Sequence, residues 1–473
     1  MDIRKKSQSG SVSVYILGML PAMVLALLFV YNSYQLSNER TRLQNSTDAV
    51  AYSVGSVSAK DLNFKAYTNR AMVANHVAVA QAVSLQSWVR WLDVFISNIQ
   101  RLTSWIPGVG SIITGIKQAM NQVEDGLGTV LGAYIRVLDA VNYLYLFAQG
   151  ASHFAANVMA IDTYAAVAQA NDPEIDTGFS IATTASAASF TAAHFGNTRR
   201  YSSSTTETVD NRDVYRMDEF RDVTLRSRDP FSWGLTRNYD LFFKIRLGVI
   251  KVDFPKAGGT TLLNDANDSD SRDYYTWQSM DTFSMHVDRL TLKGWKSEEL
   301  PIGWGGAQTG SEHDFSEQSG LGHYRKNPDA SEDIDSNPQN DDEDEMGSYS
   351  GLRTYYDIRD RGLIDRLDNK ILVVLSKPNG DEAVKTVKAL DIVPADSQVD
   401  LEQYGGLYDD RMTAISAAEL YFARPSGLSG WSRGRSSGGS GGVGIEYGNL
   451  YNPFWQTRLT SARIGGLKNA LGL

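Results

Sequence analysis

Residues 12–31 read VSVYILGMLPAMVLALLFVY, and this stretch decides how the rest of the chain is arranged. No charged residue occurs anywhere from Ser7 to Asn38. About twenty helical residues span about 30 Å, which is the hydrocarbon thickness of a bilayer. The sequence therefore predicts a single transmembrane helix over residues 11–35, with a lipid bilayer as its surroundings.

The flanks of this segment predict its orientation. Three basic residues lie in the short leader, residues 1–10, and the positive-inside rule places such a leader in the cytoplasm. Tyr31 and Tyr34 lie at the opposite end, where aromatic rings favour the interface. A cleaved secretory signal would have a shorter apolar region followed by a small-x-small site. We therefore expect the helix to be retained and the bulk of the chain to lie beyond the membrane.

Composition excludes several classes of function. The chain has 473 residues, a formal net charge of −10 and no cysteine. An acidic chain of this kind is not expected to bind nucleic acid. Without cysteine there are no disulfides, thiolate nucleophiles or thiolate metal sites. The length is sufficient for two or three domains with a sizeable core.

The segment after the membrane helix, residues 36–172, is predicted to be a mainly helical stalk and bundle. Leu36, Leu43, Val50 and Val57 recur every seven residues and form a narrow apolar stripe. A turn over residues 106–110 separates the following helices, which we expect to end at Asn171-Asp172-Pro173.

A second membrane span over residues 140–161 is a weaker alternative. The segment is uncharged apart from a histidine. Polar side chains would be costly in lipid and argue against it; they are Asn142, Gln149, Ser152, His153 and Asn157.

Strands are expected in the second half of the chain. Residues 173–400 form a mixed, strand-containing domain, and residues 401–473 hold the C-terminal strands. The clearest strand patterns are 241–254, 370–376 and 418–423. Helices first and strands later indicate an α+β fold. Two low-complexity segments are expected to be surface loops, the acidic segment 329–345 and the glycine-rich segment 426–448.

No catalytic set can be assembled from the sequence. No histidine pair has HExxH spacing, and the GxSxG matches lie in a Gly/Ser tract without a strand before them. His313 and His323 are expected to be solvated loop residues. We therefore predict that the protein is not an enzyme and needs no cofactor.

Calcium is a weak candidate ligand for the acidic segment. Alternating oxygen ligands suit this ion, and the candidates are Asp333, Asp335, Asn337 and Asp344. Pro338 stands where an EF-hand loop needs glycine, so a solvated acidic loop is the default interpretation.

Three stretches of sequence resemble the TadE/TadG-like proteins of Tad (Flp-type) pilus assembly. The first runs over residues 9–54 and joins the proline-containing apolar helix to the motif residues Arg40, Leu43, Gln44, Asn45, Asp48 and Ala49. The second is NFKAYTNRAMVAN at residues 63–75. The third combines AELYFARP at residues 418–425 with YNPFWQTRL at residues 451–459.

The resemblance implies a membrane-anchored structural or assembly component of a Tad-type pilus. It would lie in a bacterial inner membrane with its bulk in the periplasm, and its partners would be other assembly proteins or pilins. An alternative is a minor pilin or adhesive tip subunit, cleaved between Gly10 and Ser11. Tyr15 stands where a type IV pilin would place glutamate, which argues against an ordinary filament subunit. A membrane-tethered periplasmic enzyme is the third alternative.

Overall fold

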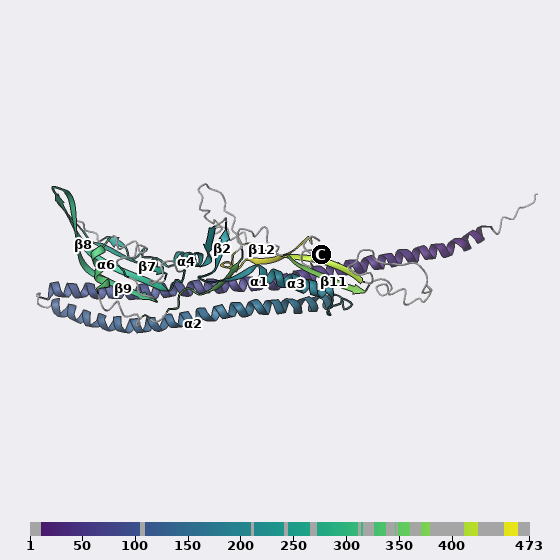
Figure 1. The fold of residues 1–473 in the computed structure, drawn as a ribbon, viewed down its shortest axis with the longest axis horizontal. Helices are drawn as coiled ribbons and strands as arrows, with labels where there is room; N and C mark the ends of the chain where they lie inside the picture. The colour runs from purple at the N-terminus through teal and green to yellow at the C-terminus, as the bar shows by residue number, and fades with distance from the viewer. Residues whose placement is uncertain are drawn as a thin grey trace, which may run out of the picture.

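The computed structural model describes most of the chain, namely residues 11–104, 109–209, 212–240, 245–264, 272–310, 314–315, 326–336, 346, 349–359, 370–378, 411–423 and 449–461. Its fold is mixed α+β, as the sequence predicts, with two long helices preceding the strands. Figure 1 shows an elongated molecule in which these helices run side by side and the sheets lie along the first of them.

The expected membrane helix and stalk are one continuous helix, α1 (Ser11–Thr103). Its 93 residues correspond to a length of about 140 Å. Pro21 lies inside it, and buried hydroxyls bond to carbonyls one turn earlier, as Thr47 Oγ1 does to Leu43 O at 2.7 Å. The N-terminal part projects beyond the rest of the molecule (Figure 1).

The second long helix, α2 (Val109–Asn171), returns antiparallel to α1. It ends where the sequence predicts, and Asp172 Oδ1 then accepts a hydrogen bond from Glu174 N at 3.1 Å. The predicted turn at 106–110 falls at the break between the helices, although residues 105–108 lie outside the described residues. The helical region is thus a hairpin of two long helices rather than several shorter ones.

An antiparallel sheet covers the C-terminal half of α1, the half away from the apolar segment. Its strands are β4 (Tyr239–Asp240), β5 (Ile245–Leu247), β6 (Ile250–Asp253), β7 (Pro255–Leu263), β8 (Thr276–Thr291) and β9 (Gly294–Thr309). β9 pairs along one edge of β8, while β7 and β6 pair with successive parts of the other edge. The single strand expected over 241–254 is wrong, because a turn at Gly248 (φ 58°) divides β5 from β6.

The end of this sheet formed by β7, the first half of β8 and the last residues of β9 is buried on both faces. Asp281 and Gly305 are register partners and face α1. Met280 and Gly306 are the adjacent pair and face α6 (Pro328–Asp335), where Met280 packs in a cluster with Ile334. Polar side chains on the α1 side are therefore removed from water and need partners inside the protein.

A smaller sheet, in the order β11 (Lys370–Pro378), β12 (Arg411–Phe422), β13 (Trp455–Thr460), packs on the part of α1 nearest its N-terminal apolar segment. The strands predicted at 370–376 and 418–423 fall in β11 and β12. Ile371, Val373 and Leu375 alternate along β11 and join Leu43 and Val50 of α1 in one core. The helix α3 (Ile181–Gly196) packs against β11 as well.

Short elements complete the fold. They are β1 (Thr198–Tyr201) paired with β10 (Tyr355–Ile358), β2 (Thr206–Val209) paired with β3 (Arg212–Tyr215), α4 (Arg216–Arg226) and α5 (Pro230–Trp233). Tyr201, Phe220 and Tyr355 from three of them share a core with α1 residues such as Met72 and Val83.

Gly305 is required for the close approach of α1 to β9. A Cβ at this position would lie 2.1 Å from the backbone nitrogen of Trp91 and 2.6 Å from the carbonyl oxygen of Ser87. Gly305→Ala is therefore expected to destabilise the protein by about 3 kcal/mol, because helix and strand must separate. Urea unfolding followed by tryptophan fluorescence measures the loss.

Gly115→Ala is the matched control. Gly115 lies inside α2, and no heavy atom lies within 4 Å of the position that a Cβ would take, so alanine is expected to stabilise the helix by about 1 kcal/mol. Equal effects of the two substitutions would contradict the assigned contact between α1 and β9.

Candidate functional site

The N-terminal part of α1 is fully exposed and apolar. Its most apolar 18-residue window has a mean hydropathy of 2.3, and none of that window is buried. Leu17 and Leu25, for example, are 78% and 66% exposed. By length and composition this segment is able to cross a membrane, as is part of α2, whose best window has a mean hydropathy of 1.3. An apolar helix that no described residue of the protein covers needs an apolar medium or partner.

The motif that follows this segment joins α1 to the small C-terminal sheet. Leu43 is 1% exposed and packs in the core formed by α1, α2, α3, β11 and β12. Gln44 Nε2 donates to Asp48 Oδ1 at 2.9 Å and to the Ile415 carbonyl oxygen in β12 at 3.3 Å. Leu43, Gln44 and Asp48 thus hold the helix against the sheet.

The remaining motif residues differ in exposure. Arg40 and Asn45 are exposed, while Ala49 is half-buried. Arg40 and Asn45 are therefore accessible to a binding partner close to the end of the apolar segment.

A network of ion pairs lies next to the same motif, where α1, the end of α2 and β11 meet. Lys377 of β11 is 1% exposed at its side chain and contacts the carboxylates of Glu39 and Asp172, the latter at 3.0 Å. Arg42 Nε lies 3.7 Å from Asp172 Oδ2, the same oxygen that Lys377 contacts. Burial raises the pKa of Asp172, but the hydrogen bonds from Lys377 and the Glu174 backbone, together with the charges of Lys377 and Arg42, outweigh burial and the pKa is lowered. The carboxylate is therefore charged at neutral pH and connects α1, the end of α2 and β11.

The second stretch that resembles the family, residues 63–75, holds α1 to the chain's C-terminal segments through side-chain amides. Asn63 makes two hydrogen bonds with the backbone of Trp455, both of 2.9 Å. Asn69 Nδ2 donates to the carbonyls of Tyr356 and Leu450, both at 2.8 Å. These helix residues satisfy backbone groups that lie 287 to 392 residues further along the chain.

All three stretches with the family resemblance therefore meet in space. The N-terminal motif contacts β12, and residues 63–75 contact the segment around β13. Gly55 lies at the centre of this contact, because a Cβ there would be 2.8 Å from Thr457 Oγ1 and 3.3 Å from Ala418 Cβ. The three stretches form one structural unit although they are distant in sequence.

A buried charged cluster lies beside this unit, where α1, α2 and α3 meet. Asp61 and Lys65 come from α1, His153 from α2 and His194 from α3, and all four are buried. The Lys65 ammonium contacts Asp61 Oδ2 and lies 2.7 Å from His153 Nδ1. His194 Nε2 lies 3.5 Å from Asp61 Oδ2 and 3.0 Å from the His153 carbonyl oxygen.

The charge state of this cluster follows from its surroundings. Burial raises the pKa of Asp61, but the hydrogen bond with His153 and the charge of Lys65 outweigh burial and lower it to about 2. Burial lowers the pKa of His194 to about 4. At pH 7 the carboxylate is ionised and the His194 imidazole is neutral, so Asp61 depends on Lys65 for its opposite charge.

The ligand atoms of Asp61, His153 and His194 lie within 4.8 Å of one another, which is close enough to hold a metal ion. Within the described part of the chain, however, the Lys65 ammonium already lies among these groups. A cation that pairs with the carboxylate is thus supplied by the protein itself. The contacts within the cluster therefore join α1, α2 and α3.

Sequence reasoning did not find this cluster. The sequence feature that points to the cluster is the pair Asp61 and Lys65, an acid followed four residues later by a base on one face of a helix. Such pairs usually lie on exposed faces. The two histidines that complete the cluster are 41 residues apart and are brought together only by tertiary structure.

The acidic segment differs from the expected loop, because residues 328–335 form α6 with Pro328 in its first turn. Asp335 Oδ1 accepts a hydrogen bond from Phe315 N at 2.7 Å. Burial and the neighbouring carboxylates of Asp329 and Glu299 raise the pKa of Asp333. Asn337 and Asp344 lie outside the described residues, so the calcium site stays a prediction.

The other expected sites outside the described residues are Gly10, His313, His323 and the glycine-rich segment 426–448. Ser11 is the first residue of α1.

The polar residues of segment 140–161 have partners on the inner side of α2. Asn142 accepts from Asn75 Nδ2 at 2.9 Å, Gln149 donates to Asn69 at 2.6 Å, and Ser152 donates to Asp61 at 2.8 Å. These polar groups face α1. The segment is therefore polar on the side that packs against α1, although most of its residues are apolar.

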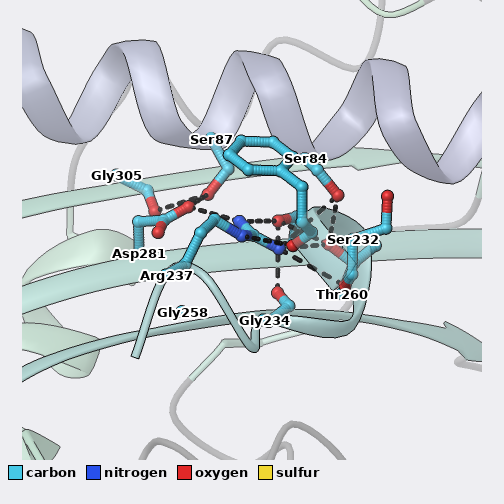
Figure 2. A network of polar contacts seen from close by, with 12 residues as sticks. Ser84, Ser87, Ser232, Gly234, Arg237, Gly258, Thr260, Asp281 and Gly305 are labelled. Atoms are coloured by element: carbon cyan, nitrogen blue, oxygen red, sulfur yellow. Dashed lines mark hydrogen bonds and ion pairs between the residues drawn. The ribbon is translucent and has the colours of Figure 1, made fainter. Parts of the chain in front are cut away.

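A second buried network joins the distal part of α1 to the large sheet (Figure 2). Arg237 Nη1 donates to Asp281 Oδ2 at 2.5 Å, and Lys256 Nζ donates to Asp281 Oδ1 at 2.5 Å. Ser87 of α1 donates to the same carboxylate at 2.9 Å, and Arg237 also reaches Thr260 at 2.7 Å. One carboxylate therefore holds two cations and the helix together.

Comparison with known proteins finds one family model that matches part of the chain. Residues 10–57 match the Tad family model, described as Flp pilus-assembly TadE/G-like. No curated protein and no solved structure matches the chain. The matched region covers the exposed apolar segment and the motif that docks on the C-terminal sheet.

Proposed function

We propose that the chain is a membrane-anchored structural or assembly component of a Tad-type pilus. The observation that carries this proposal is the extent of the family match, residues 10–57. It includes the uncovered apolar helix together with the docked motif. In this proposal residues 11–35 cross the inner membrane, and the remainder lies in the periplasm.

The architecture suits a spacer that holds a folded body away from the bilayer. Residues 36–103 continue α1 without a break, which corresponds to about 100 Å of helix. Asn63 and Asn69 fasten this helix to the strands, and Asp281 fastens it to the large sheet. A movement imposed near the membrane would be transmitted along α1 rather than absorbed by a loop.

Partners would be other assembly proteins or pilins. Arg40 and Asn45 are exposed next to the end of the apolar segment, where a second membrane-anchored protein could reach them. Nucleic acid is not a proposed partner, because the net charge is −10.

Deletion of the gene tests the proposal. We expect loss of piliation and of surface attachment, with recovery when the full chain is supplied from a plasmid. The protein should sediment with inner-membrane markers and resist extraction at alkaline pH. Normal piliation in the deletion strain would contradict an assembly role.

Intact-mass measurement separates the assembly component from a processed minor pilin or tip subunit. An N-terminus at Met1, or at residue 2, is expected for the anchored component. An N-terminus at Ser11, together with recovery of the protein in sheared filaments, would instead favour the tip subunit.

A further inference from the structure

The outer face of α2 carries large apolar side chains that nothing in the described structure covers. Leu144, Phe147 and Phe154 are 62%, 71% and 67% exposed, and Val130 and Val137 are 65% and 60% exposed. Exposed apolar residues scattered singly are ordinary, but a continuous row along one helix indicates an interaction surface.

The polarity of α2 is inverted relative to that of a surface helix. Its inner side holds Asn142, Gln149 and His153, all buried and hydrogen-bonded toward α1. Its outer side from residue 126 to residue 161 carries one exposed charged residue, Arg136, since Asp139 is buried. A surface helix normally places its charges outside, so this outer face is built to be covered.

The exposed row follows a heptad repeat. Every seventh residue from 130 is apolar and exposed, and so is the residue three positions after each; the ten are Val130, Ala133, Val137, Ala140, Leu144, Phe147, Ala151, Phe154, Val158 and Ile161. This is the a and d pattern of a coiled coil, held over five consecutive repeats. The seam therefore fits another α-helix.

Lipid fits this surface poorly. A bilayer around residues 130–161 of α2 would also meet the antiparallel stretch of α1, where Lys60 and Arg70 are exposed. Charged side chains facing lipid are costly, and the sheets on the other side of α1 would have to enter the membrane too.

We propose that the outer face of α2 pairs with the same face of a second copy of this chain, as a parallel two-stranded coiled coil. An uncharged a and d seam requires an uncharged seam opposite, and a second copy supplies it at every layer. The sheets lie along α1 on the side away from α2, which leaves this face clear for the second copy (Figure 1).

The parallel direction rests on the proposed function. If both N-terminal helices enter one membrane, a two-fold axis along the rods is required, because antiparallel rods would point their apolar segments in opposite directions. Anchoring in one bilayer also raises the effective concentration of the two helices.

Cysteine cross-linking tests the pairing, since the chain has no cysteine of its own. The variants are Leu144→Cys and Phe154→Cys in the full chain, purified in detergent micelles and oxidised with copper phenanthroline. In a parallel pair each residue meets its own copy, so both variants should give a disulfide-linked dimer. Tyr67→Cys on α1, with a 63% exposed side chain, is the matched control and should stay monomeric.

Light scattering after gel filtration gives the second measurement. The protein mass in the micelle should be about twice 52.1 kDa, and Leu144→Glu with Phe154→Glu should return it to 52.1 kDa. Tyr67→Glu should leave the dimer intact. Circular dichroism should show unchanged helix content in all variants, because each replaced side chain is exposed.

Several results would overturn the pairing. These are a single-copy mass for the unmodified chain, no cross-link at either position, or a cross-link for Leu144→Cys without one for Phe154→Cys, which an antiparallel pair centred on the seam would give. A dimer without a piliation defect in the deletion strain would reject the proposed function alone. A monomer that remains an inner-membrane pilus component would reject the pairing alone.

Discussion

Lys65→Met is expected to lower the free energy of unfolding by about 3–5 kcal/mol, because it leaves a buried carboxylate without its opposite charge. Asp61 is 3% exposed and its pKa is lowered to about 2, so the folded state holds it ionised at pH 7. Methionine has a similar length and removes only the ammonium. The measurement is urea unfolding of the full chain in detergent, followed by tryptophan fluorescence.

Two controls separate the lost charge from a general effect of substitution. Lys60→Met removes an exposed lysine five residues earlier in α1 and should leave the unfolding midpoint unchanged. The double variant Lys65→Met with Asp61→Leu should regain most of the loss, since no unpaired charge remains. An unchanged midpoint for Lys65→Met alone would show that Asp61 is neutralised in another way.

Asp281→Asn is expected to have an effect of similar size, about 3–5 kcal/mol, for the opposite reason. The carboxylate is fully buried and receives hydrogen bonds from Arg237, as Figure 2 shows, and from Lys256, so its neutralisation leaves two buried cations. Ser87 of α1 also loses a charged acceptor. The large sheet should therefore separate from α1 at lower urea concentration than the rest of the molecule unfolds.

Hydrogen exchange followed by mass spectrometry resolves this local opening. Amides of β8 and β9 should lose protection in Asp281→Asn, while those of β11 and β12 should keep it. Glu298→Gln on the exposed end of the same sheet should change neither region. Equal loss of protection in both sheets would contradict a local role for Asp281.

Part of the candidate site was predictable from sequence because it rests on local patterns. The uncharged run from Ser7 to Asn38 and the seven-residue stripe through Leu43 and Val50 predict a helix that continues beyond the apolar segment, and α1 does so. The strands at 370–376 and 418–423 were predictable because buried strands are short apolar runs.

Other features were not predictable, because local patterns do not report distant partners. The turn at Gly248 divides a segment whose alternation favours one strand. The first part of segment 329–345 is acidic, yet Ile334 is buried against Met280 and Phe315, and this packing stabilises a helix. Composition alone favours a solvated loop there.

The sequence by itself determined the apolar helix, the helical hairpin's end at Asn171 and the motif that matches the pilus-assembly family, because each depends on residues close together in the chain. Only the tertiary structure decided which partners the polar residues of α2 have and which face of the helix they occupy. His153 and Gln149 face α1 because Asp61, Lys65 and Asn69 offer them partners there. Apolar residues on the opposite face of α2, such as Phe147 and Phe154, are consequently turned outward, since a helix that places its polar side chains inside exposes its other face.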